Sequence, residues 1–117
     1  MHQDLFELID NTIRRERLYA NVNLMREDVM RLFHIGRHHL NDLLKDHVGV
    51  ASFPQYINAI RIERAYELMV SRPDMTIASV AREVGLTPSN LREQFKRKYG
   101  VTPSSFKENP PAGLSGE

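Results

Sequence analysis

The sequence predicts an all-α protein of about seven helices, in which two similar helical units are joined by one long helix. The apolar residues of the 117-residue chain recur with helical spacing, and no stretch alternates apolar and polar residues for long enough to form a strand. Capping residues and glycines mark helix ends at regular points. The chain also superimposes on itself, without a gap, when it is shifted by 51 positions.

Three short helices are predicted before the long one, at about residues 3–16, 25–33 and 37–47. Gly36 follows the turn between the second and the third, and Gly49 is a C-cap signal at the end of the third. The apolar residues that we expect these helices to bury are Leu5, Phe6, Ile9, Ile13, Val29, Leu32, Phe33, Leu40, Leu43 and Leu44.

The long linker helix is predicted at about residues 53–71. Ser52 can cap its start, Gln55 stands three residues later as in a capping box, and proline is tolerated in the first turn. The segment Arg72-Pro73-Asp74 stops the helix. Its expected buried residues are Tyr56, Ile57, Ile60, Ala65, Leu68 and Met69.

Three shorter helices are predicted after the linker, at about 77–84, 88–99 and 103–107. A threonine precedes each as an N-cap, and the last two begin with proline at the first helical position, a favoured pairing. Gly85 and Gly100 close the first two. We expect residues 1–107 to form the domain and the remaining residues, 108–117, to form a disordered tail.

The internal repeat identifies each unit as a helix-turn-helix, over about 25–48 and 77–99. A single helical hairpin is common in all-α proteins, but two copies on one long helix are typical of DNA-binding proteins. A linker helix of about 17 residues spans roughly 25 Å. It could hold two recognition helices near one DNA turn apart, about 34 Å, so that one chain reads two successive major grooves. The matching pairs are Val29/Val80, Met30/Ala81, Ile35/Leu86, Leu40/Leu91, Leu44/Phe95, Lys45/Lys96, Gly49/Gly100 and Val50/Val101.

Charge and composition narrow the function classes. The net charge is only +1, but residues 17–107 carry +5 between acidic ends of −2 each, which is compatible with phosphate contact and equally with an ordinary solvated surface. There is no cysteine, which excludes disulfides and thiolate metal sites and fits a reducing cytoplasm. No nucleophile–base set, catalytic carboxylate pair or glycine-rich phosphate loop is present, so we predict no enzyme activity and no cofactor.

The segment Thr76–Ser105, TIASVAREVGLTPSNLREQFKRKYGVTPS, resembles the C-terminal signature of the AraC/XylS family of transcription regulators. The segment Tyr56–Ala65 is similar to that family's linker helix, and the match covers about residues 22–107. The chain departs from the family pattern at Met30, where a small residue is common, and at Gly36, where a capping serine is common. It also departs at Leu86, where phenylalanine is usual.

The resemblance implies a homeodomain-like fold and sequence-specific binding of double-stranded DNA, with RNA polymerase as a further partner. It also implies that this domain ends a larger protein with an N-terminal sensor, often membrane-tethered, so Met1 need not be the native start. We expect the domain to work in the cytoplasm. The isolated chain should be a monomer, because it has no heptad seam and family members generally dimerise through other domains.

The candidate DNA contacts lie on the polar faces of the two predicted recognition helices. Arginine favours guanine, asparagine favours adenine, and a carboxylate accepts from cytosine, so such residues near a recognition helix N-terminus can read bases. The base candidates, most of them at family base-reading positions, are Arg37, His38, Asn41, Asp42, Ser89, Asn90, Arg92 and Glu93. The phosphate candidates, which position the protein without reading sequence, are Lys45, Thr76, Lys96 and Arg97.

Alternatives remain at several of these positions. The acids Asp42 and Glu93 could instead pair locally with Lys45 and Arg97. His34, His38 and His39 could suggest a metal, but no carboxylate or thiolate completes a site, so we predict none. Arg61 and Arg64 look like a surface face, although Arg61 matches a family position that braces the two halves. The alternative function is a helical protein-interaction module, which the polar exposed faces argue against.

Overall fold

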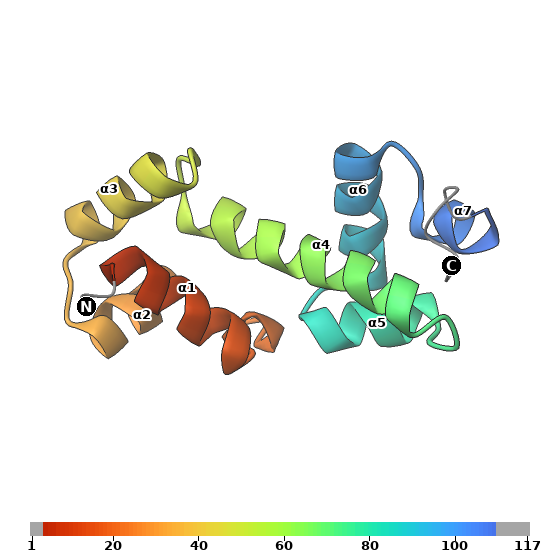
Figure 1. The fold of residues 1–117 in the computed structure, drawn as a ribbon, viewed down its shortest axis with the longest axis horizontal. Helices are drawn as coiled ribbons and strands as arrows, with labels where there is room; N and C mark the ends of the chain where they lie inside the picture. Colours follow the sequence, from red (N-terminus) through yellow and green to blue (C-terminus); the bar gives the residue numbers. More distant parts are fainter. Residues whose placement is uncertain (1–3, 110–117) are drawn as a thin grey trace. The chain divides into compact units, whose positions relative to one another are not determined.

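The computed structural model describes residues 4–109, and every regular element in that range is a helix. The chain divides into two compact units, Met1–Ile60 and Arg61–Glu117, and the longest helix contributes to both. Figure 1 labels the seven α-helices in order. The elements are α1 (Leu5–Arg15), the 3₁₀ helix η1 (Leu18–Ala20), α2 (Arg26–Phe33), α3 (Arg37–His47), α4 (Phe53–Ser71), α5 (Ile77–Val84), α6 (Pro88–Tyr99) and α7 (Pro103–Glu108).

The 51-residue repeat is a structural repeat as well. Helices α2 and α5 begin and end at residues that are 51 positions apart. Helices α3 and α6 also begin at residues that are 51 positions apart. The turn between the two helices of each unit has the same backbone: His34 and Gly85 both adopt a left-handed conformation, with φ of 56° and 83°. In each unit the next N–H closes the turn onto a carbonyl five residues back, Ile35 to Met30 at 3.1 Å and Leu86 to Ala81 at 2.9 Å.

The predicted caps form. The hydroxyls of Thr76, Thr87 and Thr102 each accept a hydrogen bond from the backbone N–H three residues on, at 3.0 to 3.1 Å. Ser52 likewise accepts from the Gln55 N–H at 3.3 Å, and the Gln55 side chain reaches back one residue further than in a standard capping box, to the Ala51 N–H. The predicted starts of α4, α5, α6 and α7 are therefore confirmed.

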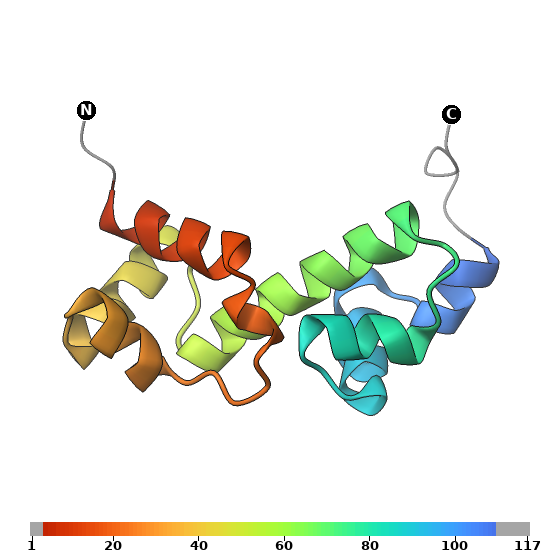
Figure 2. The same cartoon turned by 90° about the horizontal axis from the view of Figure 1, so that it is seen from below.

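Unit 1 packs α1, α2 and α3 with the first part of α4 (Figures 1 and 2). Phe6 of α1 stacks on His47 at the end of α3, with ring centroids 4.7 Å apart, and the Tyr56 hydroxyl of α4 donates a 2.5 Å hydrogen bond to Asp10. These contacts hold α1 against the end of α3 and the start of α4. The buried apolar residues of the unit are Ile9, Ile13, Tyr19, Val29, Leu40, Leu44, Phe53, Tyr56, Ile57 and Ile60.

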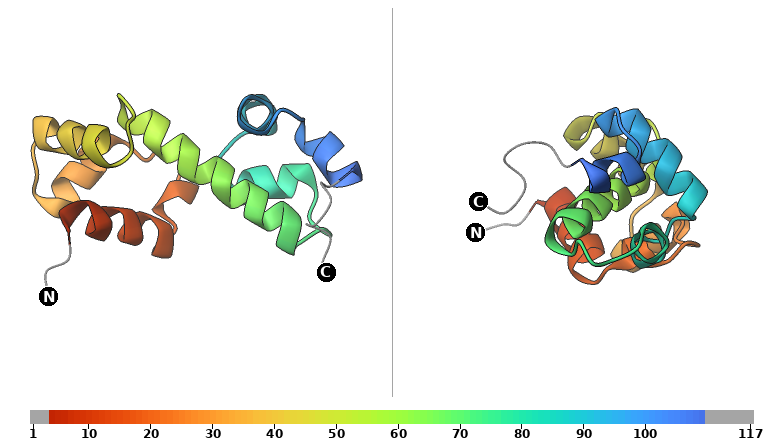
Figure 3. Two further views of the ribbon diagram at one scale, coloured as in Figure 1. Left: turned by 45° about the horizontal axis from the view of Figure 1, so that its top comes forward. Right: turned by 90° about the vertical axis from the view of Figure 1, so that its right-hand side faces the viewer.

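Unit 2 packs the rest of α4 with α5, α6 and α7, and the left view of Figure 3 looks along α6 with α5 lying crosswise beside it. An aromatic cluster joins α4, α6 and α7: Phe95 lies 4.7 Å from Tyr99 and 5.6 Å from Phe106, centroid to centroid. The Lys107 ammonium donates to the Met75 carbonyl, which ties α7 to the loop before α5. The other buried residues include Ile62, Ala65, Leu68, Met69, Val80, Ala81, Val84, Leu86 and Leu91.

The structure corrects several expectations. Leu32 is 55% exposed rather than buried, since Val29 is the residue that α2 buries. Four other residues that we expected to be buried are half-buried: Leu5, Phe6, Phe33 and Leu43. The first helix begins at Leu5, with Asp4 as its N-cap, and Met25 caps α2 rather than belonging to it. The 3₁₀ helix η1, which buries Tyr19, is not predicted by the sequence pattern. Of the predicted tail, Glu108 belongs to α7 and residues 110–117 lie outside the described part of the chain.

We predict that Leu91→Ala and Phe95→Ala each destabilise the protein by about 2–5 kcal/mol, because both side chains are fully buried where α6 meets the core. Leu32→Ala is the matched control: it removes an apolar side chain from an exposed helical site, so stability changes by less than about 0.5 kcal/mol. Thermal or urea unfolding measures all three. Wild-type stability in both α6 variants would show that the assigned inner face of α6 is wrong.

Candidate nucleic-acid interface

The outer face of α3 carries the candidates of the first unit. Burial of Leu40 and Leu44 fixes the rotation of the helix, and this leaves Arg37, His38 and Asp42 exposed. Asn41 is half-buried, and Lys45 is exposed one turn further along. Gly36 caps the helix without a side-chain acceptor. The predicted polar face of the first unit therefore exists, near the N-terminus of α3.

The outer face of α6 has the same construction. Leu91 and Phe95 are buried, and all six candidates on this helix are exposed. Four of them occupy the positions of α3 candidates shifted by 51: Ser89 matches His38, Arg92 matches Asn41, Glu93 matches Asp42 and Lys96 matches Lys45. The two helices therefore present different side chains in equivalent positions. These six residues are Ser89, Asn90, Arg92, Glu93, Lys96 and Arg97.

Ion pairs distinguish the cations of α6. Lys98 points back to α4, where its ammonium lies 3.7 Å from the Glu63 carboxylate. Arg97 lies 3.6 Å from Glu93, one turn earlier, with both side chains mostly exposed. Within residues 4–109, the side chains of Arg92 and Lys96 form no ion pair and no hydrogen bond. These two are the cations of α6 that can meet a phosphate or a base without first giving up a protein partner.

The local pairing foreseen for the two acids is found at only one of them. The Glu93–Arg97 pair forms, but an exposed pair of this kind contributes little and is screened by salt, so DNA can replace it. Between Asp42 and Lys45, both described residues, no ion pair is present. Lys45 is therefore available to a phosphate, whereas Asp42 faces outward as a bare carboxylate.

Thr76 lies at the start of α5. Its hydroxyl caps the helix by accepting a hydrogen bond from the Ser79 N–H, and it donates one to the Ser79 hydroxyl at 2.9 Å. Its side chain is therefore committed to the helix. A phosphate contact here would come from the amides of the first turn of α5, which have no carbonyl partner within a helix.

Arg61 does not belong to the surface face that the sequence suggested. It is only 8% exposed, and its burial lowers the pKa of its guanidinium. Because this guanidinium is buried in a helix that contributes to the core, its role is structural and it does not bind phosphate. Arg64, three residues on, is half-buried and lies 3.0 Å from Glu67.

Residues 4–109 hold no group of three histidine, cysteine or acidic side chains that could bind a metal ion. In the same range, no helix is both long and apolar enough to cross a membrane.

Comparison with known proteins identifies a matching family, related sequences and similar structures. The model of a family described as "Helix-turn-helix domain" matches residues 29–109. The "Uncharacterized transcriptional regulatory protein YesN" of Bacillus subtilis is 31% identical over 80 residues, which are 67% of this chain and 22% of that protein. The chain thus spans about a fifth of the length of this relative.

Two solved structures share the fold. The C-terminal domain of AraT, a response regulator from Geobacillus stearothermophilus, superimposes with a TM-score of 0.77 at 24% identity, covering 91% of this chain and 85% of that one. The DNA-binding domain of AdpA, a global transcriptional factor solved in complex with a target DNA, gives a TM-score of 0.77 at 19% identity, with 91% and 92% covered.

Proposed function

The chain belongs to the AraC-type helix-turn-helix family of DNA-binding transcription regulators, and we propose that it binds sequence-specifically with α3 and α6 in successive major grooves. The observation that carries the proposal is the equivalence of the two outer faces at a shift of 51 residues. Each is a polar helix face fixed by buried residues on the opposite side, and each has a different set of side chains. Two recognition helices in equivalent positions, with different exposed side chains, are what recognition of two different half-sites requires.

Different positions on α6 have different roles in DNA binding. Arg92 lies near the N-terminal end of the helix, one residue after buried Leu91, where a recognition helix contacts base edges. Lys96 lies one turn further along and is suited to a phosphate, which positions the protein on any sequence. In the first unit, Arg37, His38 and Asn41 take the base-reading place and Lys45 the phosphate-binding place.

The carboxylates of Asp42 and Glu93 can bind fewer groups of the DNA than the other candidates can. A carboxylate beside phosphates is repelled unless it accepts a hydrogen bond, and cytosine N4 is the base donor that it can use. Asp42, which lacks the local pair that Glu93 has, is therefore proposed to accept from cytosine in the half-site of α3. Ser89 and Asn90 complete the base-reading set of α6.

The chain is proposed to be the output domain of a longer sensor-regulator, because the relative it matches is several times longer. RNA polymerase is a proposed further partner, and no catalytic role is assigned. The domain is proposed to act in the cytoplasm, on the cytoplasmic side of the membrane if the full-length protein is tethered.

We predict that Arg92→Ala costs about 1–3 kcal/mol of binding free energy on the best operator and relaxes the preference at one base position. Lys96→Ala, its control on the same face, weakens operator and scrambled DNA alike and lowers the slope of log affinity against log salt by about one. Binding of wild type and both variants to the two DNAs at several salt concentrations tests this. Equal weakening of both DNAs by Arg92→Ala would assign Arg92 to the backbone instead.

We also predict that the isolated chain is a monomer at micromolar concentration. The large apolar residues exposed in the described part come from different elements of the chain, including Leu8 of α1, Leu32 of α2 and Val70 of α4. Sedimentation equilibrium measures the mass directly. A tight dimer would show that one of these faces is an interface.

A further inference from the structure

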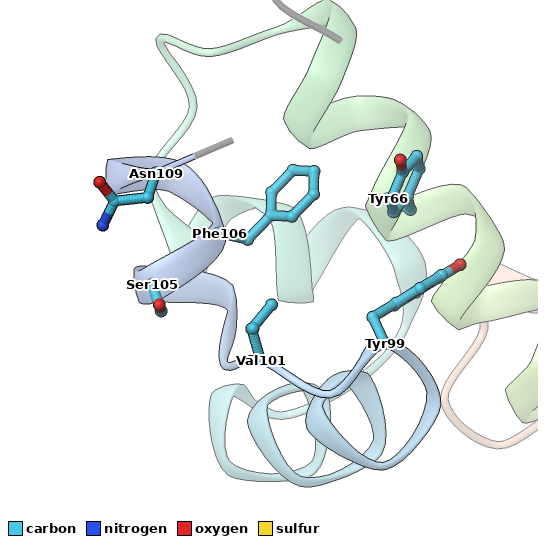
Figure 4. A pocket seen from close by; sticks show the side chains of 6 residues that line it. All are labelled: Tyr66, Tyr99, Val101, Ser105, Phe106 and Asn109. Atoms are coloured by element: carbon cyan, nitrogen blue, oxygen red, sulfur yellow. The ribbon is translucent and has the colours of Figure 1, made fainter. Parts of the chain in front are cut away.

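Unit 2 contains a pocket of about 210 Å³ where α4, the end of α6 and α7 meet (Figure 4). None of its lining residues belongs to the base or phosphate candidates, so a molecule in the pocket would displace no assigned DNA contact. Because Tyr99 is the last residue of α6, an occupied pocket would add contacts between this recognition helix and its neighbours. The lining residues are Tyr66, Tyr99, Val101, Ser105, Phe106 and Asn109.

The walls of the pocket are aromatic and are supported by the core. Figure 4 shows Phe106 and Tyr66 on two sides of the pocket, with Tyr99 next to Tyr66. The ring centroid of Tyr66 lies 4.8 Å from that of Tyr99 and 5.1 Å from that of Phe106. The fully buried ring of Phe95 contacts the rings of Tyr99 and Phe106. The pocket is therefore formed before a ligand binds, and its aromatic faces and edges suit a further ring.

We propose that this pocket binds a small uncharged aromatic molecule, with one six-membered ring and one polar substituent. The volume of the pocket sets the size of the ligand. A closed apolar cavity of about 150 Å³ holds benzene. A pocket of about 210 Å³ therefore has room for one ring and a substituent of a few atoms. A drug-sized ligand, which occupies a pocket of about 300 Å³ or more, would not fit.

The polar groups of the pocket match a polar substituent on the ring. They are the hydroxyls of Tyr66, Tyr99 and Ser105 and the side-chain amide of Asn109. Within residues 4–109, none of these four side chains forms a hydrogen bond. A hydroxyl can donate or accept, and an amide side chain does both, so they can bind a donor or an acceptor on the ligand. Such hydrogen bonds would fix the orientation of the ring between the aromatic walls.

A charged molecule fits this pocket less well than an uncharged one. Burial raises the pKa of the Tyr99 hydroxyl, and the nearby carboxylates of Glu63 and Glu67 raise it further. The same carboxylates would repel an anion, and no basic side chain lines the pocket. A cation would meet the ammonium of Lys98, which already lies 5.6 Å from the centroid of the Tyr99 ring. An uncharged ligand avoids both repulsions.

The first experiment compares four molecules of similar shape by NMR titration of the whole chain. Benzamide should shift the Val101 and Ser105 amide resonances saturably, with a dissociation constant of about 1 mM, as expected for so small a ligand. Benzoate and benzamidine, which carry opposite charges, should each bind about fivefold more weakly. Cyclohexanecarboxamide, which lacks the aromatic ring, should bind about two- to tenfold more weakly.

Substitutions then test whether benzamide binds in this pocket. Ser105→Phe places a ring at the pocket and should abolish binding. Ser104→Phe is the matched control: Ser104 is adjacent and also exposed but does not line the pocket, so binding should equal that of wild type. Tyr99→Phe removes only the hydroxyl and should weaken binding by about two- to tenfold. Circular dichroism checks the fold of each variant, and if Ser105→Phe fails to fold, the result for Tyr99→Phe decides.

Several results would overturn the inference. Wild-type binding by Ser105→Phe, or an equal loss in Ser104→Phe, would place benzamide elsewhere, as would shifts spread equally over the amides of both units. Benzoate bound as tightly as benzamide would contradict the choice of an uncharged ligand. Cyclohexanecarboxamide bound as tightly would contradict the role of the aromatic walls. None of these measurements involves DNA, so the inference can fail while the proposed function stands.

Discussion

The structure depends on how each reading helix is fixed in rotation by two buried side chains one turn apart. In α3 these are Leu40 and Leu44, and in α6 they are Leu91 and Phe95. Because a helix turns by 100° per residue, burying these positions leaves the opposite face to solvent whatever side chains it carries. The core thus determines where the face lies, and the exposed residues are free to determine what it recognises. This separation allows one architecture to appear twice in a chain with different polar content.

The turn before each reading helix shows how far two sequences can diverge over one backbone. Gly85 adopts its left-handed conformation at little cost, whereas His34 adopts it as a residue with a side chain. The helix that follows is capped by the Thr87 hydroxyl in unit 2 and by Gly36 alone in unit 1. Unit 1 therefore has the weaker local signals, and it is also the unit to which α1 is added, through Phe6, Asp10 and Tyr56.

Much of this could be predicted from the sequence, because helix starts and ends depend on local chemistry. A threonine followed by proline, or a glycine that ends an apolar pattern, specifies its boundary within a few residues. The burial of a side chain depends instead on which other elements pack against it in the folded protein. Leu32 fits the apolar pattern of α2 yet stays exposed, and Arg61 looks like a surface cation yet is buried. No periodicity indicates η1, which is a single turn.

We infer that α3 and α6 are equivalent recognition helices, each with its own half-site. Selection of binding sites from random DNA tests this most directly. The triple variant Ser89→His, Arg92→Asn, Glu93→Asp gives α6 the residues that α3 carries 51 positions earlier. Wild type should select two different half-sites about 10 base pairs apart. The variant should keep one unchanged and convert the other toward the same sequence. Selection of no site, or a change in both halves at once, would contradict the account.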